Sequence, residues 1–222
     1  MAFTTFASRT QAGQLLATQV AKLSFEQPVV LALPRGGVPV ALEVARVLKA
    51  PMDLLLVRKV GVPWQPELAA AAVVDGERRD LVFNDEVMLM LGLNREDIER
   101  AAAKEISEID RRRKLYLKGR EPISVAGRTA IVVDDGIATG TTVKAALQAL
   151  KKRNPKRLVL AVPVAPSHTI EELGAFVDDI ICLQQPEPFN AIGLFYSDFH
   201  QVGDEEVIEM LASADTSSQT DA

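Results

Sequence analysis

The segment 132–142, VVDDGIATGTT, contains residue types that together can bind a phosphorylated sugar. An apolar run ends in adjacent carboxylates, Asp134 and Asp135, and a loop of glycines and threonines leads into a helical pattern that begins at Val143. Unpaired amide N–H groups and the dipole at a helix start both favour an anion, and glycines let the backbone approach it closely. The residues predicted to hold a phosphate are Gly136, Ala138, Thr139, Gly140, Thr141 and Thr142.

The adjacent acids need a different partner, because carboxylates repel a phosphate. A sugar diol, or a cation that the diol shares, suits them, since carboxylates accept hydrogen bonds from neighbouring hydroxyls. A diol close to a monophosphate describes a ribose 5-phosphate. The alternative is a turn with capping side chains and no ligand. A nucleotide-binding P-loop is absent from the sequence because no lysine directly follows Gly140.

The elements that must position this loop alternate along the chain. Apolar runs predict strands at 28–34, 52–60, 129–134 and 157–164, and helical spacing predicts helices, the first of them capped by Ser8. The run at 68–75 fits a strand or a helix, and its neighbours favour a strand. Unbroken apolar strands of this kind predict an α/β fold, a doubly wound and mostly parallel sheet with helices on both faces. The glycine and prolines of 61–67 predict a loop.

The domain organisation follows from the same patterns. We expect a single domain over 1–212, with an inserted helical segment at about 84–120 and a disordered, small and polar tail at 213–222. The net charge of −5 argues against a nucleic-acid partner, and the lone cysteine and the two histidines argue against disulfides and zinc clusters. No stretch is apolar enough for a membrane span or a signal peptide, so a cytoplasmic protein is expected.

The 132–142 motif is similar to the phosphoribosyl pyrophosphate motif of type I phosphoribosyltransferases. LPRGG at 33–37, RKVGVPWQPE at 58–67 and FNAIGLFYSDF at 189–199 also resemble family stretches, namely a pyrophosphate-binding loop, the start of a flexible loop and hood residues. The resemblance covers most of 8–212. It implies a parallel sheet, a flexible loop over the site and a small hood, to which the C-terminal region contributes, that recognises the acceptor.

The resemblance also implies the roles of individual residues. The protein would transfer ribose 5-phosphate from phosphoribosyl pyrophosphate to a small-molecule acceptor and release pyrophosphate, with Mg²⁺ as the cofactor. Asp134 and Asp135 would position the ribose and contact the metal directly or through substrate or water. Catalysis is assigned to these acids with Lys59 and Arg35. The implied pyrophosphate-binding residues are Arg35, Gly36, Gly37, Arg58 and Lys59, and the implied acceptor-binding residues are Phe195, Tyr196 and Phe199.

One position departs from the 6-oxopurine branch of the family, where an aspartate in this loop assists deprotonation of the base. Ala138 stands there in this chain. An acceptor that needs little such help is therefore expected: an already anionic base, an amine or an oxyanion. The alternatives are a non-catalytic protein that senses phosphoribosyl pyrophosphate or nucleotides, and an unrelated sugar-phosphate-binding protein. A homodimer is a further expectation, and Trp64 is expected either in a mobile lid or packed in the hood or a subunit interface.

Overall fold

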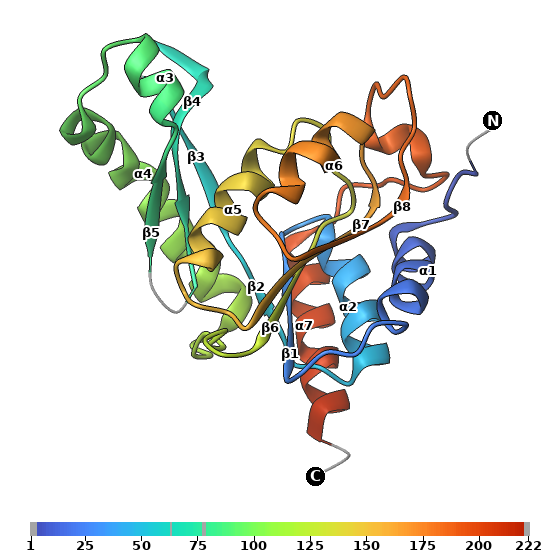
Figure 1. Cartoon of the computed structure of the whole chain (residues 1–222). Helices are drawn as coiled ribbons and strands as arrows, with labels where there is room; N and C mark the ends of the chain where they lie inside the picture. The colour runs from blue at the N-terminus through green and yellow to red at the C-terminus, as the bar shows by residue number, and fades with distance from the viewer. Residues whose placement is uncertain (1–3, 63, 77–78, 220–222) are drawn as a thin grey trace.

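A five-stranded parallel sheet forms the centre of the protein (Figure 1). The computed structural model describes residues 4–62, 64–76 and 79–219. The strand order is β2-β1-β6-β7-β8, and every neighbouring pair is parallel. This confirms the predicted parallel α/β fold. The strands are β1 (Pro28–Ala32), β2 (Met52–Leu54), β6 (Thr129–Val133), β7 (Arg157–Val164) and β8 (Asp179–Gln184).

Helices cover both faces of this sheet because its strands are apolar on both sides. Alternate residues point to opposite faces, so Val30 and Ile131 belong to one core cluster and Leu31 and Val132 to the other. One face is covered by α1 (Arg9–Val20), α2 (Gly37–Leu48) and α7 (Asp204–Gln219), and the other by α5 (Thr141–Lys151) and α6 (Ser167–Gly174) (Figure 1).

A second, antiparallel sheet lies beside the first (Figure 1). It consists of β3 (Val57–Val62), β4 (Gln65–Val74) and β5 (Asp80–Phe83), and α3 (Asp85–Met90) and α4 (Arg95–Leu117) follow it. The predicted single strand at 52–60 is therefore wrong: β2 and β3 lie in different sheets. Leu54, Leu55 and Leu56 are all buried where the chain passes between the sheets, so hydrophobicity does not mark the break.

The predicted loop at 61–67 is also wrong over most of its length. Residues on both sides of position 63 pair as a hairpin, with Gly61 opposite Ala69 and Val62 opposite Gln65. The register shifts on either side of Gly61, so glycine marks an irregularity within the ladder. Pro63 itself lies outside the described residues.

The two ends of the described chain settle two further predictions. Ser8 caps α1, where its hydroxyl accepts a hydrogen bond from the Gln11 amide at 3.3 Å, as predicted. The disordered tail is wrong for 213–219, because α7 continues to Gln219; residues 220–222 lie outside the described part. A short 3-10 helix, η1 (Ile192–Phe195), precedes α7. Among the described residues, no helix is long and apolar enough to span a membrane.

Candidate functional site

A small cavity lies at the carboxyl end of β6, where the acidic segment turns into α5. Its volume is about 130 Å³. Gly140 adopts a left-handed conformation (φ 71°) at the N-terminus of α5, and the Thr169 hydroxyl fixes the loop from α6 by donating to the Ala138 carbonyl at 3.1 Å. The structure brings together all the residues that the sequence predicted for the phosphate. The lining consists of Asp134, Gly136, Ile137, Ala138, Thr139, Gly140, Thr141, Thr142 and Val143, which we call the cradle.

The two acids have different surroundings. Asp134 is half-buried and lines the cradle, whereas the carboxylate of buried Asp135 accepts a hydrogen bond from Nε of Arg9 at 2.7 Å. Arg9 also donates to the carbonyl of His200 at 2.8 Å, and the Tyr196 hydroxyl donates to the Asp135 carbonyl at 2.5 Å. The equal roles expected for the acids therefore do not fit the structure, because an arginine already engages Asp135.

Burial and charge act on both carboxyls. Burial raises the pKa of Asp134, and the neighbouring charge of Asp135 raises it further. Burial also raises the pKa of Asp135, while the hydrogen bond and the charge of Arg9 oppose that rise. Asp134 is consequently the carboxyl that gains most from a cation or hydroxyl donor in the cradle.

The glycines of the LPRGG stretch lie directly against the acids. A Cβ atom on Gly36 would come within 2.1 Å of the Asp135 carboxylate, and one on Gly37 within 2.8 Å of the Val133 carbonyl. Arg35, whose peptide bond to Pro34 is cis, extends to α7, and its Nη1 lies 3.4 Å from the Asp204 carboxylate. The structure thus places the predicted pyrophosphate loop beside the acid pair.

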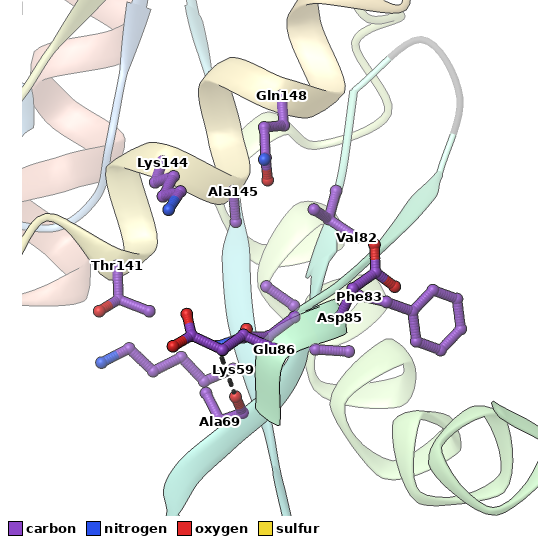
Figure 2. Close-up of a pocket in the computed structure, with 13 residues that line it drawn as sticks. Lys59, Ala69, Val82, Phe83, Asp85, Glu86, Thr141, Lys144, Ala145 and Gln148 are labelled. Carbon is purple, nitrogen blue, oxygen red and sulfur yellow. Dashed lines mark hydrogen bonds between the residues drawn. The ribbon is translucent and has the colours of Figure 1, made fainter. Parts of the chain in front are cut away.

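Arg58 and Lys59 lie next to each other on β3 and have different surroundings. Nε of Arg58 donates to Glu105 of α4 at 2.8 Å. Lys59 lines a pocket between the antiparallel sheet and α5, together with Thr141 and Lys144 (Figure 2). Because Arg58 and Lys59 are adjacent in β3, their side chains point to opposite sides of the strand. In this structure neither residue lines the cradle.

The aromatic residues expected at the acceptor pack among themselves. Tyr196 is buried between Phe6 and Phe199, with ring centroids at 5.4 and 5.1 Å. Phe199 also lies under the Arg9 guanidinium, 3.8 Å from its ring centroid, and Phe195 stacks on Phe189 at 5.3 Å. Acceptor stacking by Tyr196 is wrong for this arrangement because its ring faces are covered.

Phe189 instead lines a pocket that adjoins the cradle at Ala138 and Thr139. This pocket has a volume of about 630 Å³. The other residues that line it come from the start of α6 and from the segment after β8, namely Pro166, His168, Thr169, Glu172, Glu187, Pro188 and Asn190. The second histidine, His200, is placed elsewhere, between Asp198 and Glu206.

Arg9 is the site residue that the sequence did not indicate. Its partners Asp135 and His200 lie 126 and 191 positions away along the chain. Arg9 follows the Ser8 cap, where a charged residue is ordinarily solvent-exposed, so no local pattern distinguishes it. Arg9 could have been singled out only if its ion-pair partner, Asp135, had been known to be buried.

Open α/β proteins bind ligands at the carboxyl ends of their parallel strands. This chain has an acid pair and a cavity at that end of β6. The phosphoribosyl transferase domain family matches residues 7–199 of this chain. The chain therefore belongs to that family.

Individual relatives agree with this placement. "Putative phosphoribosyl transferase Rv0571c" of Mycobacterium tuberculosis H37Rv and its counterpart MT0597 in strain CDC 1551 are each 44% identical over 209 residues, which is 94% of this chain. The chain spans about half the length of these curated relatives, 47%. The crystal structure of TT1426 from Thermus thermophilus is similar at 41% identity with a TM-score of 0.83, over 94% of this chain and 98% of that one.

Proposed function

We propose that this protein transfers the ribose 5-phosphate group of phosphoribosyl pyrophosphate to a small-molecule acceptor and releases pyrophosphate. The observation that carries the proposal is the cradle itself. It combines a helix N-terminus with a carboxyl, Asp134, and it lies against the Gly36–Gly37 backbone. The 5-phosphate would bind at the helix N-terminus, the ribose diol at Asp134 and the pyrophosphate at the Gly36–Gly37 backbone.

Each group has a defined part in this reaction. Backbone amides and the hydroxyls of Thr139, Thr141 and Thr142 would hold the 5-phosphate. Asp134 would accept hydrogen bonds from the ribose hydroxyls and favour positive charge at C1. The bond from C1 to the pyrophosphate oxygen breaks, the electron pair leaves with pyrophosphate, and the acceptor atom bonds to C1 from the opposite face. The amides of Gly36 and Gly37, with Arg35, would stabilise the departing charge.

Arg35 would first have to exchange its partner. Its Nη1 is 3.4 Å from Asp204, and the hydroxyl of Tyr116 donates to that same carboxylate at 2.7 Å. The pair is partly exposed, so pyrophosphate could compete for the guanidinium at small cost. Tyr116 would then remain as the partner of Asp204.

Mg²⁺ fits this site through Asp134, whose carboxyl lines the cradle and forms no ion pair among the residues that the structure describes. Asp135 fits less well as a ligand, because its Oδ2 already accepts the Arg9 hydrogen bond. Within the described ranges no cluster of three or more metal-binding side chains occurs, so substrate phosphates would supply most of the ligands. When bound, the ion would neutralise charge on the leaving pyrophosphate.

The pocket beside Ala138 is the proposed acceptor site. In the described part of the chain, its lining includes the carboxylates of Glu172 and Glu187 and no lysine or arginine. This charge supports an amine over an anionic base or an oxyanion, since carboxylates repel an anion. Either glutamate could take up the proton that an amine loses on transfer.

The test is a titration followed by a turnover assay. Calorimetry with phosphoribosyl pyrophosphate and Mg²⁺ should show binding that Asp134→Asn weakens strongly. Pyrophosphate release should then be measured across amines, nucleobases and orthophosphate. Absence of binding by the wild-type protein would refute the proposal, whereas binding without release for every acceptor class would favour the sensor alternative.

A further inference from the structure

A groove that is separate from Asp134 runs along one face of α5. Two pockets, of about 310 and 590 Å³, form it and share Val82, Phe83, Asp85 and Gln148. The first begins at Thr141 and lies between α5 and the antiparallel sheet (Figure 2). The second continues to Lys151. Because they share these four residues, the two pockets adjoin along α5, and we call them together the α5 groove.

The helix side of the groove is a polar stripe. Thr141, Lys144, Gln148 and Lys151 are spaced three, four and three residues apart, which places them on the same face of α5. Lys144 and Lys151 are about 10 Å apart along the helix axis. An extended chain of phosphates could contact both ammonium groups.

The lysines of this stripe have no carboxylate partner in the described part of the chain, and Nζ of Lys144 lies 5.3 Å from the ring centroid of Phe176. Among the residues that the structure describes, no ion pair involves Lys59, Lys144 or Lys151, although the whole chain carries a net charge of −5. The acid at the centre of the groove, Asp85, already has Arg95 at 3.4 Å. Glu86 is the remaining acid in the lining. The groove therefore attracts anions within a protein that otherwise repels them.

The opposite side of the groove is apolar. Ala71, Ala72 and Val82 of the antiparallel sheet are buried beneath it. Half-buried Phe83 lines both pockets from the edge strand β5, where the Arg95 guanidinium lies 4.7 Å from its ring centroid. A flat heterocycle could lie on this floor while its phosphates reach the lysines.

We propose that the α5 groove binds an oligophosphate ligand of the nucleoside triphosphate class. Its phosphates lie along Lys144 and Lys151, and its base contacts the floor near Phe83. The groove meets the cradle at Thr141, the residue common to both. The proposed oligophosphate site therefore borders the proposed phosphoribosyl site, and its two lysines lie outside the cradle.

The experiment titrates the full chain with fluorescent N-methylanthraniloyl-ATP in the presence of a saturating concentration of ribose 5-phosphate, which keeps the probe out of the cradle. The double variant Lys144→Gln/Lys151→Gln should bind the probe at least about tenfold more weakly. Lys104→Gln, which alters an exposed lysine on α4, should bind like wild type. Thermal unfolding confirms that each variant is folded.

A second set of titrations distinguishes a nucleoside triphosphate from an inorganic polyphosphate as the ligand. Tripolyphosphate should displace the probe, since it has the same chain of phosphates. Phe83→Ala should weaken the binding of the nucleotide severalfold and leave the binding of tripolyphosphate unchanged. Failure of the wild-type protein to bind the probe would overturn the proposal, as would unaltered binding by the double variant. Equal effects of Phe83→Ala on both ligands would refute the nucleoside part.

Discussion

The guanidinium of Arg9 and the carboxylate of Asp135 form a buried ion pair, with Nε 2.7 Å from Oδ2. Arg9 lies in the first turn of α1, and Asp135 follows β6, so the pair joins the N-terminal helix to the loop that leads into the cradle. Because Arg9 also binds the carbonyl of His200, it connects a third segment. This geometry leaves Asp134 as the acid that faces the cradle.

Replacement of Arg9 should destabilise the protein strongly. Arg9→Met leaves Asp135 as a buried, unpaired carboxylate, and breaking such a pair costs about 3–5 kcal/mol. Urea denaturation would measure the loss, and the double variant Arg9→Met/Asp135→Asn should recover a large part of it. Arg46→Met, which removes an exposed pair with Glu43, should cost about 1 kcal/mol at most. Equal losses in both arginine variants would contradict this account.

Asp134→Asn should stabilise the free protein at neutral pH. Because the pKa of Asp134 is raised in the folded state, the native protein binds its proton more tightly than the unfolded chain does. The stability from this group is complete below the unfolded pKa and is lost as pH rises through the folded pKa. Between pH 4 and pH 8, the free energy of unfolding of the variant should increase relative to that of wild type as pH rises. A constant difference would show that the carboxyl is not perturbed.

Gly36→Ala should displace the loop that carries Arg35. The added Cβ would lie 2.1 Å from Oδ2 of Asp135, so the loop or the acid has to move. We expect a loss of about 1–3 kcal/mol, as for other overpacked sites, and weaker binding of phosphoribosyl pyrophosphate. Gly174→Ala is the matched control, since nothing lies within 4 Å of its Cβ. The prediction fails if both variants have the stability and the binding affinity of wild type.

Tyr196→Phe should affect stability more than acceptor binding. Its hydroxyl donates to the Asp135 carbonyl, and loss of one such hydrogen bond costs about 1 kcal/mol, or more where the carbonyl stays unsatisfied. Because other aromatic rings cover Tyr196, KM for the acceptor should stay within about twofold of wild type. A large rise in KM at unchanged stability would restore the stacking role expected from the family resemblance.

Trp64 provides an intrinsic probe of hairpin closure. It is the single tryptophan of the chain and is 67% exposed beside the turn between β3 and β4. If the hairpin closes on bound phosphoribosyl pyrophosphate and Mg²⁺, the indole should leave water and its emission should shift to shorter wavelength. Fluorescence titration checks this, with the weakly binding variant Asp134→Asn as the control. An unchanged spectrum in the wild type at saturation would argue against a lid.

Local patterns were sufficient where a property depends on neighbours in the chain. The Ser8 cap, the buried strands and the glycines and threonines of 136–142 are all set by steric and hydrogen-bonding preferences within a few residues. Residues 52–67 were misread because the apolar run spans two sheets, and a run alone does not reveal which partner strand each residue meets. The unstructured tail was misread since Val207 and Leu211 anchor α7 to the core, which outweighs its weak helical composition.

By itself, then, the sequence determined the parallel α/β class, the cradle and the acid pair, because these follow from periodicity and from the chemistry of adjacent residues. The tertiary structure alone decided how the acids differ: Arg9 engages Asp135, and Asp134 is left facing the cavity. It also turned Arg58 towards Glu105 and brought Lys59 beside Lys144. Electrostatic roles of this kind depend on burial and on contacts between distant segments, and only the folded chain brings those segments together.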